Sequence, residues 1–141
     1  MERLRARVAA RARGDRGAST VEFLFITPVL FLVILAIVQF GLYYFASTVC
    51  EASAQAGARK ARASADASPG GWQGLARSTT QNRISSLAPS LAGDPSITTF
   101  QDGDQVGVTV TARVVKVVPF LNLTVTSKSV GPIERFVPDA G

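Results

Sequence analysis

Residues 16–46 read RGASTVEFLFITPVLFLVILAIVQFGLYYFA, and this stretch decides how the chain is organised. From residue 23 to residue 46 it is apolar except at Thr27, Pro28, Gln39 and Gly41, none of which is charged. At about 1.5 Å of rise per residue, a helix over this run crosses a hydrocarbon core roughly 30 Å thick. A helix in the core of a soluble protein needs a polar face, and this run has none. The sequence therefore predicts a transmembrane helix.

The charges before the apolar run predict its orientation. Residues 1–17 contain six arginines and two acidic residues, and so hold +4 of the chain's net charge of +5. By the positive-inside bias, the N-terminus stays in the cytoplasm and the chain beyond Ala46 lies outside the membrane. Because residues 18–141 carry only the remaining +1, we expect no phosphate-binding surface and no nucleic-acid partner.

Glu22 is an acidic residue at the start of the apolar run. An acid costs up to about 2.5–3.5 kcal/mol at the bilayer centre and less at the edge, so one interpretation is an interfacial carboxylate that reaches back to water. The spacing offers a second interpretation. If the chain were cut after Gly17, the new amino terminus at Ala18 would stand one helical turn from Glu22. The ammonium and the carboxylate could then neutralise each other, within one subunit or between staggered neighbours.

The combination of Gly17, Glu22 and Phe23 before an apolar helix resembles the processing site of type IV pilin-like proteins. It is most similar to the TadE/TadG-like pseudopilins of the Tad/Flp pilus assembly system. The resemblance covers residues 14–62 and includes a proline early in the helix, the aromatic segment 40–44 and the Gly-Ala-Arg element 57–59. It implies that a prepilin peptidase cuts between Gly17 and Ala18, and that Glu22 and Phe23 act in assembly.

The resemblance also implies what the protein does and what it contacts. It predicts a pseudopilin-like, single-pass subunit in the cell membrane, belonging to a pilus assembly or secretion apparatus. Its partners would be the lipid bilayer, other pilin-like subunits, the assembly platform and the prepilin peptidase. The alternative is an uncleaved, membrane-anchored accessory or binding module whose extracytoplasmic β domain is the interaction surface.

Beyond Ala46 the chain is rich in alanine and lacks proline up to residue 67, so the helix is predicted to continue as a stalk. One i+4 row carries small residues that let another element approach closely; its members are Ala46, Cys50, Ala54, Ala58 and Arg62. The row is either a packing seam, against partner subunits or the chain's own domain, or part of a solvated helix. Gln39 either bonds to a neighbouring helix or has no special role.

The rest of the chain predicts a small α+β domain. Residues 68–71 (SPGG) break the helix, and a second helix is predicted over 72–88. Its apolar side is expected to hold Trp72, Leu75, Ala76, Thr79, Ile84 and Leu87. Alternation of Val and Thr then predicts strands at 97–100, 106–118 and 123–130, with a turn at 102–104. The expected fold is α+β: a long N-terminal transmembrane helix with its stalk, a second short helix and a three-stranded antiparallel meander.

Three domains follow from these boundaries: a basic cytoplasmic leader at 1–17, the helix and stalk at 18–67, and an extracytoplasmic domain at 68–141. No catalytic, cofactor-binding or metal-binding residue is expected, because the chain has no histidine and a single cysteine. The pair Asp102 and Asp104 lacks the ligand spacing of a calcium loop. Cys50 is expected to be a buried or seam-facing small residue, with an interchain disulfide as the alternative.

Overall fold

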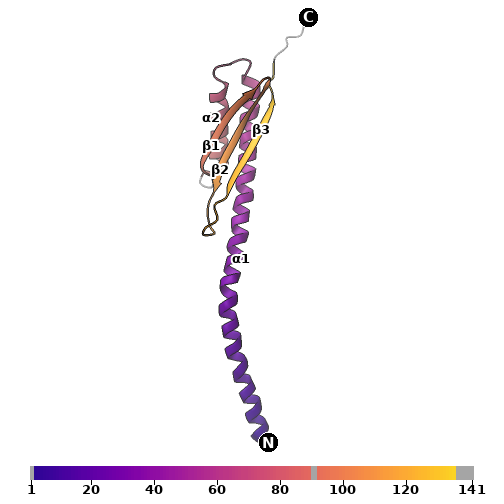
Figure 1. The fold of residues 1–141 in the computed structure, drawn as a ribbon, viewed down its shortest axis with the longest axis vertical. Helices are drawn as coiled ribbons and strands as arrows, with labels where there is room; N and C mark the ends of the chain where they lie inside the picture. The colour runs from indigo at the N-terminus through magenta and orange to yellow at the C-terminus, as the bar shows by residue number, and fades with distance from the viewer. Residues whose placement is uncertain (1, 90–91, 136–141) are drawn as a thin grey trace. The chain divides into compact units, whose positions relative to one another are not determined.

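The computed structural model describes residues 2–89 and 92–135, with the backbone only for residues 2–19 and 92–93. Its elements in chain order are α1 (Glu2–Ser64), α2 (Trp72–Leu87), β1 (Ala92–Asp102), β2 (Gln105–Val114) and β3 (Thr124–Pro132) (Figure 1). This is the predicted α+β composition. The chain divides into two compact units, Met1–Val38 and Gln39–Gly141.

The first unit is the N-terminal part of α1. The helix begins at Glu2, so residues 2–17 of the predicted basic leader are part of it. Pro28 lies inside the helix and does not end it. From Val21 to Val38 the large apolar side chains are exposed except for the half-buried Leu35, with Phe23 at 71%. Among the side chains described from residue 20 onward, none in this unit covers them.

The second unit contains the sheet, whose strand order β1-β2-β3 and antiparallel pairing confirm the predicted meander. The turn predicted at 102–104 is also confirmed, since Asp102 pairs with Gln105 across it. Gly103 has φ of +56°, a left-handed conformation that glycine adopts without steric cost. β1 is longer than the predicted strand at 97–100, because its pairing with β2 extends back to Ala92.

The second strand ends earlier than its sequence predicts. β2 stops at Val114, whereas the run of valines suggested a strand as far as residue 118. Residues 115–123 form instead the connection to β3, called here the β2–β3 loop. The reason is a competing hydrogen-bond partner: the backbone N–H groups of Val117 and Val118 donate to the side chain of Gln39.

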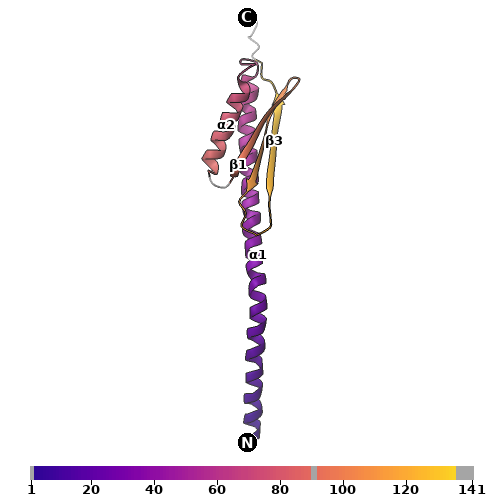
Figure 2. The same cartoon turned by 60° about the vertical axis from the view of Figure 1, so that its left-hand side comes forward.

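The core of the second unit lies between one face of the sheet and the two helices. Alternate residues of β2 are buried from Val106 to Val114, as the period-two pattern requires. The later part of α1 contributes small buried residues, which are Ala46, Cys50, Ala54, Ala58 and Ala61. Figure 2 shows α2, this part of α1 and the sheet side by side. The predicted seam is therefore confirmed as packing against the chain's own domain.

The buried side of α2 differs from the predicted one. Its buried residues are Trp72, Ala76, Thr80 and Ile84, an i+4 row along the helix. Leu75 and Leu87, predicted to face the core, are 42% and 40% exposed. The sequence pattern favoured the large apolar residues. The packed structure selects the row whose small members, Ala76 and Thr80, fit against Gly57 of α1.

Candidate functional site

The exposed apolar segment of α1 is the most conspicuous feature of the first unit. Within the described part of the chain, one helix is long and apolar enough to cross a membrane, and it lies within Thr20–Ser64. The apolar side chains Leu24, Phe31 and Ile37 are more than half exposed. Exposed apolar surface on this scale marks a contact with lipid or with other apolar helices. A membrane anchor explains it.

The residues predicted for processing and assembly lie at the start of this segment. Gly17 and Ala18 are within α1, in regular helix, although their side chains lie outside the described set. Glu22 and Phe23 are both exposed. Since α1 is unbroken here, positions 18 and 22 keep the one-turn spacing on which the charge-neutralisation hypothesis depends.

Gln39 is the first residue of the second unit, and its side chain is 1% exposed. Its amide Nε2 donates to the carbonyl oxygen of Val115 at 3.1 Å. Its Oε1 accepts the N–H of Val117 at 2.7 Å and the N–H of Val118 at 3.1 Å. One side chain therefore satisfies three backbone groups that have no strand partner. The sequence offered a bond to a neighbouring helix or no role; the structure shows a bond to the β2–β3 loop.

Gly57 lies where α1, α2 and β2 meet. A Cβ atom added there would overlap Thr80 Oγ1, and would approach the carbonyl oxygen of Ala76 and Cγ2 of Val108 to 3.2 Å each. The absence of a side chain thus allows both elements to approach α1. Gly57 belongs to the Gly-Ala-Arg element singled out in the sequence. The third residue of that element, Arg59, is exposed.

Cys50 is fully buried within the same packed region and carries a free thiol. Burial raises its pKa above the ordinary value of 9.0, because the apolar surroundings disfavour the thiolate. A thiol held in this way is a poor nucleophile, so its structural role is packing. This agrees with the predicted buried, seam-facing residue.

Charged residues gather where α1 ends, beside the β1–β2 turn and the end of β3. Arg62 pairs with Glu134 at 3.5 Å, and the backbone N–H of Glu134 donates to the carbonyl oxygen of Arg62. The Arg62 side chain also covers Gly131, where a Cβ would meet its Cδ at 2.7 Å. Asp104 forms an ion pair with Arg135. This carboxylate of the turn therefore has a structural partner, and no cluster suited to a metal ion exists among the described residues.

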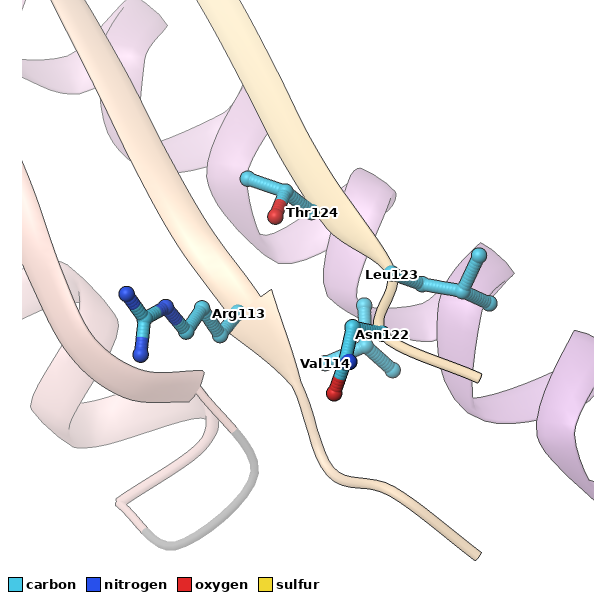
Figure 3. A pocket seen from close by; sticks show the side chains of 5 residues that line it. All are labelled: Arg113, Val114, Asn122, Leu123 and Thr124. Atoms are coloured by element: carbon cyan, nitrogen blue, oxygen red, sulfur yellow. The ribbon is translucent and has the colours of Figure 1, made fainter. Parts of the chain in front are cut away.

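The sheet ends in a shallow pocket of about 450 Å³ near the start of the β2–β3 connection. Figure 3 shows its lining, which comes from the end of β2 and the start of β3: Arg113, Val114, Asn122, Leu123 and Thr124. These side chains offer a guanidinium, an amide and a hydroxyl for hydrogen bonding. The set contains no carboxylate, thiol or imidazole, so it provides no general base. No motif in the sequence indicated this pocket.

Together these features define a class of protein: a chain with one exposed apolar helical segment near its N-terminus and a small α+β unit that includes the later part of the same helix. Residues 17–59 match the model of a family described as TadE-like protein. Over this segment, which is less than half of its length, the chain is similar to TadE-like proteins. Comparisons with curated proteins and with solved structures found no match.

Proposed function

We propose that this protein is a membrane-anchored, pseudopilin-like subunit of a Tad/Flp-type pilus assembly or secretion apparatus. The N-terminus stays in the cytoplasm, the apolar segment of α1 crosses the membrane, and the α+β unit lies on the far side. A prepilin peptidase removes residues 1–17. The subunit then packs through its apolar helix with other pilin-like subunits and with the assembly platform.

One observation carries this proposal above the others. The large apolar side chains from Val21 to Val38, except that of Leu35, are exposed in the chain by itself, and they begin within the Gly17–Phe23 sequence at which the family match starts. A helix with an apolar surface all round belongs in lipid or among similar helices. The apolar surface of α1 would then serve twice. It contacts lipid while the subunit is in the membrane, and it packs against other helices in the assembly.

Glu22 is the residue that connects processing to assembly in this proposal. Cleavage after Gly17 creates an ammonium group at Ala18, one turn from the exposed Glu22 carboxylate. Burying an acid among packed apolar helices is costly unless an opposite charge accompanies it. The new amino terminus supplies that charge, from the same subunit or from a staggered neighbour.

Mass spectrometry of the mature N-terminus tests the processing step. The chain is expressed in cells with and without a prepilin peptidase. We expect an Ala18 start only with the peptidase, and loss of this product in Gly17→Leu. Gly14→Leu is the matched control, because it changes a leader glycine that is not next to the cut, and it should be processed normally.

The alternative function is an uncleaved, single-pass accessory or binding module with its β domain as the interaction surface. The polar outer face of the sheet supports this candidate, since Thr98, Thr126 and Lys128 lie there and are exposed. A chain that keeps its leader in cells containing the peptidase favours this alternative over the pseudopilin.

A further inference from the structure

We infer that the β2–β3 loop dips into the outer leaflet of the bilayer, so that the α+β unit contacts the membrane at a second point besides α1. The inference rests on the membrane anchor of the proposed function. It adds a lipid-binding surface to a unit that the sequence describes only as extracytoplasmic.

The first step is the depth at which the loop is held. The hydrogen bond that Gln39 donates to Val115, and the two that it accepts from Val117 and Val118, fix these loop residues beside it. Gln39 directly follows Val38, the last residue of the first unit. A helix from residue 21 to residue 38 is roughly 27 Å long, close to the thickness of the hydrocarbon core. Gln39 then stands at the outer edge of that core, and the loop stands with it.

The second step is the chemistry of the loop. Apart from one lysine and one asparagine, its residues are valine, leucine, proline and phenylalanine. Phe120 at its tip is 97% exposed, and its φ is +69°. A bulky residue in this left-handed region is an outlier with an energetic cost. No described part of the chain covers the ring that this conformation holds outward. An apolar medium outside the chain explains why the ring is presented in this way.

The third step is the surface around the loop. In the same unit, Phe40 and Tyr44 of α1 are 66% and 76% exposed. Tyrosines concentrate where hydrocarbon meets the headgroups. Lys116 is exposed within the loop, where its stem can lie along apolar surface while its ammonium reaches lipid phosphates. Loop, aromatic residues and cation together fit the headgroup boundary of a bilayer.

Spin-label accessibility in vesicles tests the inference on the full chain. Single cysteines replace Phe120, Phe31 and Val130 in a Cys50→Ala background, and each labelled chain is reconstituted into phosphatidylcholine–phosphatidylglycerol vesicles. Collisions with oxygen, which enters hydrocarbon, are compared with collisions with a water-soluble nickel(II) chelate. Val130 is the matched control: it is an exposed apolar residue of the same unit, near the opposite end of β3. Phe31 reports on the anchor.

We expect labels at positions 31 and 120 to favour oxygen and the label at position 130 to favour the nickel chelate, with a several-fold difference in the collision ratio. A label at 120 as accessible to nickel as that at 130, while 31 remains in lipid, overturns the inference and leaves the anchor intact. A water-exposed label at 31 overturns the anchor as well. Protection of 120 only at high protein-to-lipid ratios also overturns the inference, because a second copy then covers Phe120.

Discussion

Gln39 Oε1 accepts the backbone N–H of Val117 at 2.7 Å, which joins two residues 78 positions apart in the chain. With the bonds to Val115 and Val118, this amide ends β2 and fixes the course of the β2–β3 loop. Gln39, a polar residue inside an apolar run, therefore has a structural role. Gln39 is the first residue of the second unit, and along the described side chains of α1 it is the first that is fully buried.

Replacing Gln39 by leucine tests this role. Gln39→Leu keeps the side chain's bulk and leaves two N–H groups and one carbonyl oxygen without their partner. We expect the free energy of unfolding to fall by about 1–3 kcal/mol. The measurement is denaturant unfolding of the full chain in detergent micelles, followed by the fluorescence of Trp72, the single tryptophan.

Gln55→Leu is the control for this variant. Gln55 is an exposed glutamine of α1 whose amide donates only to Glu51 at 3.3 Å. Its replacement should cost less than about 0.5 kcal/mol. Equal losses of stability in the two variants contradict the role assigned to Gln39.

Gly57 provides a test of the packing between α1 and α2. In Gly57→Ala the new methyl group overlaps Thr80 Oγ1, so we expect a loss of about 1–3 kcal/mol in unfolding free energy. Thr80→Ala removes that oxygen, and the double variant should therefore lose less stability than the two single variants together. The coupling in this double-mutant cycle is the decisive quantity.

Gly74→Ala is the matched glycine for that cycle. Gly74 lies in α2 with no atom within 4 Å of an added Cβ. Its replacement should raise the free energy of unfolding by about 0.5–1 kcal/mol, because alanine is more favourable than glycine inside a helix.

The double-mutant cycle also has an outcome that contradicts the packing argument. Additive effects of the substitutions at positions 57 and 80 show that the two residues are not in steric conflict.

Glu22 tests the assembly hypothesis. Glu22→Gln removes the charge and keeps the shape, so the Ala18 ammonium has no carboxylate one turn away. We expect normal membrane insertion and processing, with a loss of recruitment into the pilus assembly, measured by cross-linking and fractionation in cells. Glu51→Gln, an exposed acid further along α1, should assemble normally. Assembly of Glu22→Gln at the level of the unchanged chain removes the role assigned to this carboxylate.

Cys50 predicts a pH dependence of stability. Burial raises the pKa of its thiol above 9.0 in the folded chain, whereas the unfolded chain ionises near that value. The stability contribution is therefore complete below about pH 9 and is lost as the pH rises toward the folded pKa. We expect the unchanged chain to lose stability faster than Cys50→Ala in this range, as judged by Trp72 fluorescence. We also expect the Cys50 thiol of the folded chain to be alkylated slowly at pH 8. Identical pH profiles of stability for the two chains contradict the raised pKa of Cys50.

Much of the architecture follows from local patterns. The apolar run at 23–46 predicts the long helix, and alternation of Val and Thr predicts three strands. Both patterns can be read locally, because each reflects the surroundings of one helix or strand. The turn at 102–104 follows from Gly103, which alone among its neighbours adopts positive φ freely. The arrangement of Gly17, Ala18, Glu22 and Phe23 is likewise a matter of spacing along one helix.

Other features could not be predicted in this way because they depend on pairs of residues far apart in the sequence. The segment 115–118 has the local pattern of a strand. Only the approach of Gln39 takes the carbonyl oxygen of Val115 and the N–H groups of Val117 and Val118 out of the sheet. Leu75 and Leu87 have the hydrophobicity of core residues. Only the fit of Ala76 and Thr80 against Gly57 decides which side of α2 is buried.

By itself, the sequence determined that this chain has an apolar helix of membrane length, an acid and a glycine at its start, and a three-stranded meander at its end. The tertiary structure decided where the exposed part of that helix gives way to the packed part, which row of α2 faces inward, and where Phe120 is presented. The physical reason is that periodicity records the environment of one element, whereas hydrogen bonds and close packing between elements are settled only when those elements meet.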